Sequence, residues 1–414
     1  MANIEIVTHT LRNGLKILFI ENHKLPLTAF FTFYKVGSRN ERPGITGISH
    51  LFEHMMFKGS KKFPEGAFDE ILTANGGFSN AYTTRDMTVY YEVFPSRLFE
   101  KVVEMEADRM QYLNVGKDSL EAERQVVMEE RLMRTDNHIE GVLVEQLYAN
   151  AYVAHPYQWP VIGWMSDIEN ITLEQCLEYF KIYYSPNNAV IVVSGDVDPD
   201  TAIPVMETFY EQFPPQVSPP AVITREPGQS GNKYIHVKKE AGLQQILMGY
   251  HTLNSANPDI FALDAMQVIL GNGHSSRLYQ RLVEQEKTAI QAYGSFSYQL
   301  DPGLFTFHFN LAEKGTPERI EKGFDEELEK MKQDLVSETE LEKAVNILKS
   351  DFVHHLSTLE GRGHEAGKNE LLFGDSDLVN SIYRKYSELT VEQIREVSRK
   401  YFAEGRTMVI LDKM

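Results

Sequence analysis

The 414-residue sequence has almost no cysteine, no excess of positive charge and no long apolar run. Its single cysteine, Cys176, excludes an intrachain disulfide and fits poorly with a structural zinc site, which usually includes several thiolates. The net charge of −18, from 41 basic and 59 acidic residues, argues against a nucleic-acid partner, because phosphate binding needs basic patches. No apolar run reaches the roughly 18 residues of a membrane span. The N-terminus shows no signal peptide, so we expect a cytoplasmic protein, or a periplasmic one if a signal peptide was removed.

One short stretch carries a metal-binding pattern. His50, Glu53 and His54 form the order H-x-x-E-H, which is typical of inverted zinc peptidases. On a helix, positions i, i+3 and i+4 share a face, so the three side chains would point into one small volume. Two neutral imidazoles can hold zinc, and the carboxylate can take a proton from water. Apolar neighbours predict a buried helix over 48–57, where polar groups need partners. The alternative is a helix with two surface histidines.

A third ligand must come from elsewhere, because a catalytic zinc usually has three protein ligands and one open position. The best candidate is a helix predicted over 118–134. Its residues Glu123, Val126, Val127 and Glu130 recur at the spacing of one helical face, which we expect to turn toward the core. The alternative is a charged helix whose glutamates face water, and the pattern alone does not decide between the two.

These motifs resemble the pitrilysin-type (M16) zinc peptidases, which include insulin-degrading enzyme and the β subunit of the mitochondrial processing peptidase. The resemblance runs over nearly the whole chain and is carried by residues 50–60, 75–83, 88–91, 123–130 and 155–163. The family's spacing selects Glu130 as the third zinc ligand, beside His50 and His54. The resemblance also implies that Glu53 is the general base of the catalytic centre, that Glu123 is a supporting acidic residue there, and that each chain holds one zinc ion.

The resemblance also implies a substrate-binding strand. In the family, Asn80, Ala81, Tyr82 and Thr83 lie on an edge strand, to which a peptide adds by main-chain hydrogen bonds. From the residues alone, the alternation of Thr, Tyr and Val over 78–93 predicts a strand of an ordinary core hairpin. Only the family assigns these four residues to substrate.

An internal duplication divides the chain. Residues 171–193 match residues 389–411 at a constant offset of 218 (389 minus 171). In each copy, Thr-x-Glu-Gln predicts a helix start, and the apolar run after the helix predicts a buried strand. The stretch 213–232 is rich in Pro, Gly and Ser, which is typical of a linker. We therefore expect an N-terminal zinc-binding catalytic domain over 1–212 and a homologous C-terminal domain without the metal motif over 233–414.

The predicted fold class is α+β. Strands are expected at 4–7, 16–21, 28–36, 233–237 and 244–250. The mixture of hairpin strands and long helices predicts that each domain is a mixed or antiparallel sheet with helices packed on one face. This is also what the resemblance implies, as the LuxS/processing-peptidase-like fold.

The second half departs from the family pattern. The metal motif aligns loosely with Ala262, Ala265 and Met266, so we expect no metal in this half. Arg277 and Arg281 are expected to make structural salt bridges.

A catalytic pair that active family members carry is also missing. They place an Arg and a Tyr, at a fixed spacing, where they hold the substrate carbonyl and the developing oxyanion. One register puts Val283 and Ile290 at those places, and another puts Glu286 where the Arg should precede Tyr293. Neither register gives the pair.

The resemblance therefore implies a zinc-dependent metalloendopeptidase that hydrolyses peptides or unfolded polypeptides. Because the Arg/Tyr pair is missing, we expect this chain to be the zinc-bearing subunit of a heterodimer with a second chain of similar length, or else a homodimer. The competing hypothesis is a non-catalytic assembly subunit. The glycine-rich stretch 271–277 lacks the spacing of a nucleotide fingerprint, so no nucleotide is expected.

Overall fold

The computed structural model describes residues 3–403 and 405–413, which form two compact units. Each unit is assembled from separate stretches of sequence. The first unit draws on the chain up to Arg131, on Trp159–Thr224 and on His354–Asn380, and the second on Leu132–Gln158, Arg225–Val353 and the chain from Ser381. The sequence predicts two continuous domains, 1–212 and 233–414. The structure differs because each half contributes one helical segment to the unit built mainly from the other half.

A six-stranded sheet forms the centre of the first unit, in the order β1-β2-β6-β3-β5-β4. The strands are β1 (Val7–Thr10), β2 (Lys16–Glu21), β3 (Leu27–Tyr34), β4 (Phe78–Thr83), β5 (Thr88–Pro95) and β6 (Ala189–Gly195). Strands β2 and β6 pair in parallel and all other neighbours pair antiparallel, so the sheet is mixed. Strand β4 lies at an edge, with β5 as its partner.

Helices from both halves of the chain belong to this unit. They are α1 (Ile48–Met55), α2 (Ala67–Ala74), α3 (Phe99–Tyr112), α4 (Lys117–Arg131), α6 (Met165–Asn170), α7 (Leu173–Tyr183), α8 (Pro199–Tyr210) and α12 (Leu359–Phe373). Helix α1 contacts β4, β5 and α4, whereas α12 contacts β2, β3 and β6. The helix that carries the H-x-x-E-H motif is therefore packed between the sheet edge and the helix that carries Glu123 and Glu130.

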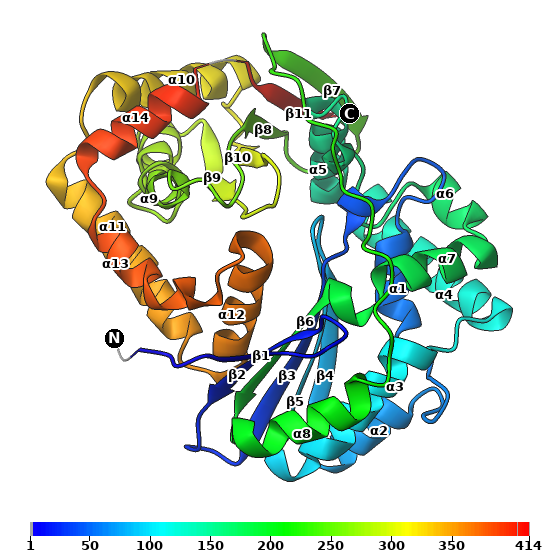
Figure 1. Cartoon of the computed structure of the whole chain (residues 1–414). Helices are drawn as coiled ribbons and strands as arrows, with labels where there is room; N and C mark the ends of the chain where they lie inside the picture. The colour runs from blue at the N-terminus through cyan, green and yellow to red at the C-terminus, as the bar shows by residue number, and fades with distance from the viewer. Residues whose placement is uncertain (1–2, 404, 414) are drawn as a thin grey trace. The chain divides into compact units, whose positions relative to one another are not determined.

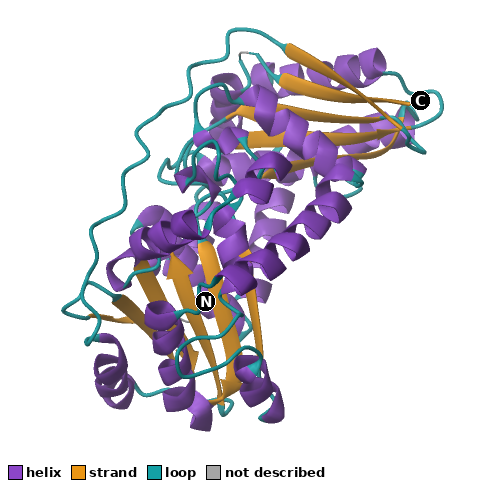
Figure 2. Ribbon diagram, turned by 90° about the vertical axis from the view of Figure 1, so that its right-hand side faces the viewer, coloured by secondary structure: helices purple, strands orange, loops and turns teal. Residues whose placement is uncertain are grey.

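Both faces of this sheet are covered, because β3 is buried along nearly its whole length. Phe30 and Tyr34 belong to the main core on the side of α1. Side chains alternate along a strand, so Phe31 points to the opposite face, where Gly363 and Gly367 of α12 meet β3. The prediction of helices on one face is wrong in this respect, because a helix from the second half covers the other face (Figure 1). Figure 2 shows helices against the strands of both sheets.

The second unit repeats the first. Its sheet has the order β7-β11-β8-β10-β9, with β7 and β11 parallel and the other neighbours antiparallel. The strands are β7 (Lys233–Lys239), β8 (Gln245–His251), β9 (Ala289–Phe296), β10 (Leu304–Leu311) and β11 (Thr407–Lys413). The helices are α5 (Ile139–Ala151), α9 (Ile260–Gly271), α10 (Pro317–Gln333), α11 (Glu338–His355), α13 (Ile382–Ser387) and α14 (Val391–Tyr401), and the last two residues of α11 belong to the first unit. Helix α5 contacts β7, β8 and β11, as α12 contacts β2, β3 and β6 in the first unit.

The structure confirms the internal duplication. Helices α7 and α14 each start with a complete capping box, Thr172 with Gln175 and Thr390 with Gln393. Each helix leads into a central strand, β6 or β11, which has a parallel neighbour on one side and an antiparallel neighbour on the other. The predicted α+β class with two homologous mixed sheets is therefore confirmed.

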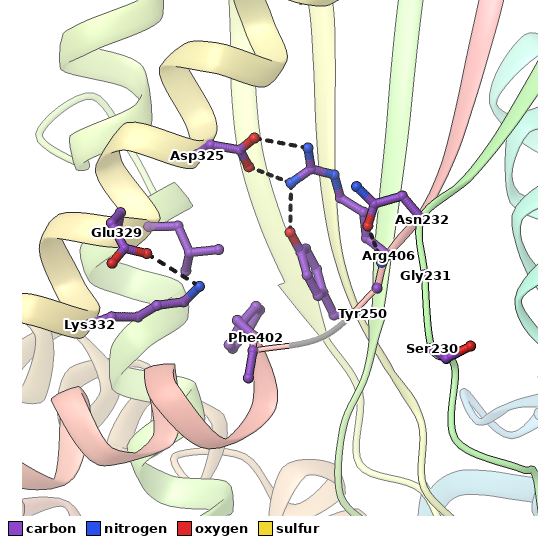
Figure 3. Close-up of a pocket in the computed structure, with 12 residues that line it drawn as sticks. Ser230, Gly231, Asn232, Tyr250, Asp325, Glu329, Lys332, Phe402 and Arg406 are labelled. Atoms are coloured by element: carbon purple, nitrogen blue, oxygen red, sulfur yellow. Dashed lines mark hydrogen bonds and ion pairs between the residues drawn. The ribbon is translucent and has the colours of Figure 1, made fainter.

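One buried arginine ties the last strand of the second sheet to a helix. Arg406 lies just before β11 and is 5% exposed. Its guanidinium donates to the Tyr250 hydroxyl at 2.8 Å and pairs with Asp325 and Glu321 of α10. Figure 3 shows this arginine beside Tyr250 and Asp325. The two carboxylates compensate the positive charge of this buried guanidinium, and the hydroxyl accepts one of its hydrogen bonds.

Some predicted boundaries differ from the structure. The first strand is Val7–Thr10 and not 4–7, since the main chain of Ile4 bonds to the Asn380 side chain instead. A single helix is predicted over 118–134, but the α-helix ends at Arg131 and a π-helical turn, Leu132–Asp136, follows it. Residues 214–230 contain no helix or strand, as expected for a linker. None of the described helices combines the length and apolarity needed to cross a bilayer.

Candidate metal centre

Helix α1 starts at a glycine and a buried carboxylate. Gly47 is its N-cap residue with φ of 89°, a left-handed conformation that glycine adopts without strain. Glu41 accepts hydrogen bonds from the main-chain N–H groups of Gly47 at 2.8 Å and Ser49 at 2.9 Å, so it caps the helix in place of a side chain at position 47. Burial raises the pKa of Glu41 to about 8, although these hydrogen bonds oppose the rise. The motif therefore lies on a helix whose first turn is fixed.

The buried side of α4 differs from the prediction. Val127 and Glu123 are both buried, but Val126 is 48% exposed. The expectation that all four residues of the pattern turn toward the core is wrong at Val126. The buried stripe of α4 includes Leu120, Glu123 and Val127, which places Val126 outside it. Glu130 is half-buried at the border of this stripe, and α4 contacts α1.

Three predicted ligands converge between these helices. The Nε2 atom of His54 lies 3.2 Å from Oε2 of Glu130, and the Nε2 atom of His50 lies 3.7 Å from the same oxygen. The ligand atoms of the three side chains lie within 4.8 Å of one another. Two ligands bound to one tetrahedral zinc ion at about 2.0–2.1 Å lie about 3.3 Å apart. The separations of 3.2 and 3.7 Å are close to that value, so the three side chains are placed to hold a single ion.

Glu123 contacts the other nitrogen of His54. The distance from His54 Nδ1 to Glu123 Oε2 is 3.3 Å, and the second oxygen of Glu123 pairs with Lys58 at 3.0 Å. A carboxylate on the far nitrogen of a ligating histidine fixes the tautomer and the ring orientation. The hydrogen bond to His54 lowers the pKa of Glu123. Glu123 therefore contacts a predicted ligand, His54, and is a positioning residue that would not bind the ion itself.

The charges around His54 favour a cation. Burial alone would lower the pKa of His54, but the hydrogen bonds to Glu123 and Glu130 outweigh it and raise the pKa to about 9. The same carboxylates that favour a proton on this ring would favour a divalent ion beside it.

Glu53 is held by the edge strand. Its Oε2 atom accepts a 2.6 Å hydrogen bond from the hydroxyl of Thr83, the last residue of β4. Glu53 is half-buried and is the third member of the predicted motif. Thr83 is also one of the four predicted substrate contacts. The strand and the proposed base are therefore joined by a direct hydrogen bond, which the sequence does not indicate.

The other predicted substrate contacts lie along β4. The main-chain N–H of Ala81 donates to its neighbour's side chain, Asn80 Oδ1, at 2.8 Å, and the Asn80 amide donates to the Tyr91 hydroxyl at 3.3 Å. Tyr82 instead places its hydroxyl 2.6 Å from His364 of α12. An edge-strand N–H that bonds to a side chain can exchange that partner for the carbonyl of an added strand.

In the second half, the described residues at the positions aligned with the metal motif are not metal ligands. Ala262, Ala265 and Met266 are buried in the core on α9. The expected salt bridges are confirmed. Arg277 forms a bidentate ion pair with Glu340, with N–O distances of 2.9 and 3.0 Å. Arg281 pairs with Glu286, Glu326 and Glu327.

A hollow of about 620 Å³ lies in the second unit, beside Arg406 (Figure 3). The arginine's guanidinium is already paired with Asp325 and Glu321, and no histidine is among the described residues that line the hollow. These described residues do not form a metal ligand set, so the candidate site is the cluster between α1 and α4.

Comparisons with known proteins relate the chain to a peptidase family. Residues 17–163 match a family model described as insulinase (peptidase family M16), and residues 170–348 match one described as the peptidase M16 inactive domain. The chain is 34% identical to zinc protease PqqE of Helicobacter pylori, over 98% of this chain and 92% of that protein. It is 25% identical to the uncharacterized zinc protease YmxG of Bacillus subtilis, over 98% of both.

Solved structures show the same fold. A protease from Helicobacter pylori superposes with a TM-score of 0.95 at 32% identity, covering 99% of this chain and 100% of that one. A peptidase M16 inactive domain from Pseudomonas fluorescens superposes with a TM-score of 0.89 over 99% of this chain and 98% of that one. At 20% identity, this second likeness concerns the fold alone.

Proposed function

Because the chain belongs to peptidase family M16, we propose that it is a zinc-dependent endopeptidase acting on peptides or unfolded polypeptides. The observation that carries the proposal is the convergence of His50, His54 and Glu130 on one small volume, with Glu53 on the same helix face. Two imidazoles and one carboxylate are the ligand set of a catalytic zinc site, which keeps an open position.

The zinc ion, when bound, polarises the substrate carbonyl and lowers the pKa of a water molecule. Glu53 takes the proton from the attacking water and passes it to the departing amine. The Thr83 hydroxyl donates to one oxygen of Glu53 and so helps to orient this carboxylate beside β4. Glu123 fixes the His54 ring so that its Nε2 atom faces the ion.

We also propose that substrate adds to β4 as an extra strand. Strand β4 is the edge of its sheet and has β5 as its partner. A peptide paired at 80–83 by main-chain hydrogen bonds would be recognised with little regard to its side chains. Its backbone would then lie beside Thr83, which contacts Glu53.

The stabiliser of the developing oxyanion comes, in this proposal, from a second M16 chain of similar length. Arg277 and Arg281 are committed to carboxylates of their own unit. The hydroxyl of Tyr293 lies 2.5 Å from His308 Nδ1. These side chains are engaged in structural contacts, which supports a division of labour between two chains.

A second candidate function is that of a non-catalytic assembly subunit. The match of residues 170–348 to the model of the M16 inactive domain favours it. A scaffold, however, has no need of a glutamate held beside two histidines. Zinc content and peptide hydrolysis distinguish the two functions.

The test compares the wild-type chain with Glu53→Gln. Zinc per chain is measured by mass spectrometry, and hydrolysis by an unstructured fluorogenic peptide, with the chain alone and with an M16 chain that lacks H-x-x-E-H but carries the Arg/Tyr pair. We expect Glu53→Gln to keep its zinc and to lose about 10²–10⁴-fold in kcat, because a general base is removed. Glu70→Gln, at an exposed position on α2, is the matched control.

Each outcome addresses a different part of the proposal. Full activity of Glu53→Gln would exclude Glu53 as the base, and a wild-type chain that binds no zinc would overturn the whole function. Full turnover by the chain alone would contradict the two-chain arrangement only. Zinc binding with no hydrolysis under either condition would favour the assembly subunit.

A further inference from the structure

A second group of metal-type ligands lies on the other side of β4. His355 is the last residue of α11, and His364 and Glu365 lie in the first half of α12. The ligand atoms of these three side chains lie within 4.8 Å of one another. We propose that they bind a second divalent transition-metal ion of the zinc class, since imidazole and carboxylate together suit such ions.

The ring of His364 is arranged as that of a metal ligand. It packs beside Phe31 and Phe33, with ring centroids 6.3 and 6.1 Å away, and its Nε2 atom lies 2.6 Å from the Tyr82 hydroxyl. Its Nδ1 atom is buried and has no hydrogen-bond partner among the described residues. A buried polar atom without a partner is costly. If Nε2–H donates to Tyr82, the Nδ1 lone pair is free for an ion, which is how ligating histidines are usually held.

Glu365 and His355 complete the set from two sides. The Glu365 side chain is 6% exposed, and its Oε2 atom lies 3.7 Å from Nε2 of His355. The rings of His355 and His364 are 5.8 Å apart and nearly perpendicular, at 88°. The His355 side chain is 44% exposed, so it can turn by the roughly 1 Å that would bring the ligand atoms to the separation of about 3.3 Å around one zinc ion. Water can occupy the remaining positions.

A neighbouring lysine opposes the ion and weakens the site. Lys368 Nζ lies 2.7 Å from Oε2 of Glu365. A carboxylate has two oxygens, so the lysine can keep one while the ion takes the other. The positive charge still repels a cation at this distance. We therefore expect this site to bind more weakly than the site of His50, His54 and Glu130.

The two ligand groups are separated by the alternation of side chains along β4. Thr83 turns to Glu53 at the first centre, and its neighbour Tyr82 turns to His364 at the second. Successive residues of a strand point to opposite faces. The second ion would fix the His364 tautomer that donates to Tyr82, and would thereby brace the strand from the side opposite Glu53.

The experiment counts ions on the full chain. Metal is removed with a chelator, Zn²⁺ is returned by equilibrium dialysis, and bound zinc per chain is measured by mass spectrometry. We expect two ions for the wild type and one for His355→Asn. The matched control is His354→Asn, the adjacent exposed histidine, which should keep two ions. Because the His355 side chain is 44% exposed, its substitution is expected to change the thermal unfolding of the metal-free chain little.

A second variant is expected to change the zinc affinity of this site in the opposite direction. Lys368→Met should tighten the weaker site by about tenfold, because it removes a neighbouring positive charge. His54→Asn should remove the other ion and leave this one, so failure of one site is distinguishable from failure of the other. One ion in the wild type together with an unchanged count in His355→Asn would overturn the proposal, as would equal losses in His354→Asn and His355→Asn.

Discussion

At the scale of the residue, His54 links the proposed ion to its support. Its Nε2 atom faces Glu130 and its Nδ1 atom faces Glu123, so one ring is held by carboxylates at both nitrogens. Lys58 holds the second oxygen of Glu123, which keeps that carboxylate charged and oriented. Glu123 and Glu130 therefore have different roles, although both are glutamates of α4: Glu123 supports the His54 ring, and Glu130 is a predicted ligand.

This difference predicts the effect of Glu123→Gln. The amide keeps an oxygen for the Nδ1–H of His54 but loses the negative charge, so we expect zinc affinity to fall about 10–100-fold with the fold intact. Competition with a chromophoric chelator measures the affinity. Glu129→Gln, on the exposed side of the same helix, should leave the affinity unchanged. An unaltered affinity in Glu123→Gln would show that the carboxylate does not support the site.

The sequence identified most residues of the candidate site but not their contacts. The spacing of the motif is short and lies within two turns of one helix, so His50, Glu53 and His54 could be grouped without a structure. Thr83 lies on strand β4 and Glu53 on helix α1, so their contact depends on how these two elements pack. The contact of His355 with His364 also joins two helices, at a spacing that no helical face has, and no local pattern predicts it.

At the scale of the element, α12 packs closely against β3 through two glycines. A Cβ atom built on Gly367 would lie 2.1 Å from the Phe33 ring, and one on Gly363 would lie 2.7 Å from the Phe31 ring. These glycines allow the contact, because any side chain there would force the aromatic rings to move. The burial of both faces of β3 depends on this approach.

We therefore expect Gly367→Ala to destabilise the protein. Alanine favours a helix by about 1 kcal/mol over glycine, but overpacking against Phe33 should cost about 1–3 kcal/mol. The net loss is expected as a lower urea midpoint. Gly116→Ala is the control, since a Cβ there meets its nearest atoms at the ordinary distances of 3.6 and 3.8 Å. A stabilised Gly367→Ala variant would contradict the close packing of α12.

The elements themselves were predicted well where the pattern was local. Strand β2 and the strand–helix repeat of both halves agree with the sequence because alternation and capping boxes are short-range signals. The burial of Val126 was predicted wrongly, because the spacing of a helical stripe does not say where its centre lies. Contacts with α1 and the core decide that.

At the scale of the whole molecule, the chain crosses between its two units. Helix α5 of the first half packs on the second sheet, and α12 of the second half packs on the first. Neither half of the sequence therefore contains all the elements that cover its own sheet. This is the physical reason why the predicted continuous boundaries differ from the compact units.

Acid stability is expected to depend in part on one ion pair of the second unit. Arg277 holds the pKa of Glu340 at about 2, below its usual 4.5. The folded state thus binds this proton more weakly than the unfolded state, so the stabilisation is present above about pH 4.5 and is lost as the pH falls toward 2. Because the carboxylate is partly in solvent, we expect about 1 kcal/mol at neutral pH.

Urea unfolding at pH 7 and near pH 3 tests this expectation. Glu340→Gln should be less stable than the wild type at pH 7, and the difference should shrink at the lower pH. Glu342→Gln, exposed on the same helix, should match the wild type at both values. A difference that stays constant with pH would show that the lost stability does not come from the ionised carboxylate.

Residue types at short or repeated spacings were enough to predict the metal motif, the duplication, the α+β class and the loss of the motif in the second half. Three features could be read only from the folded chain: Glu130 lies beside His50 and His54, Thr83 donates to Glu53, and α5 and α12 each cover the sheet formed mainly by the other half. These facts depend on which surfaces pack together, and packing joins residues that are far apart along the chain.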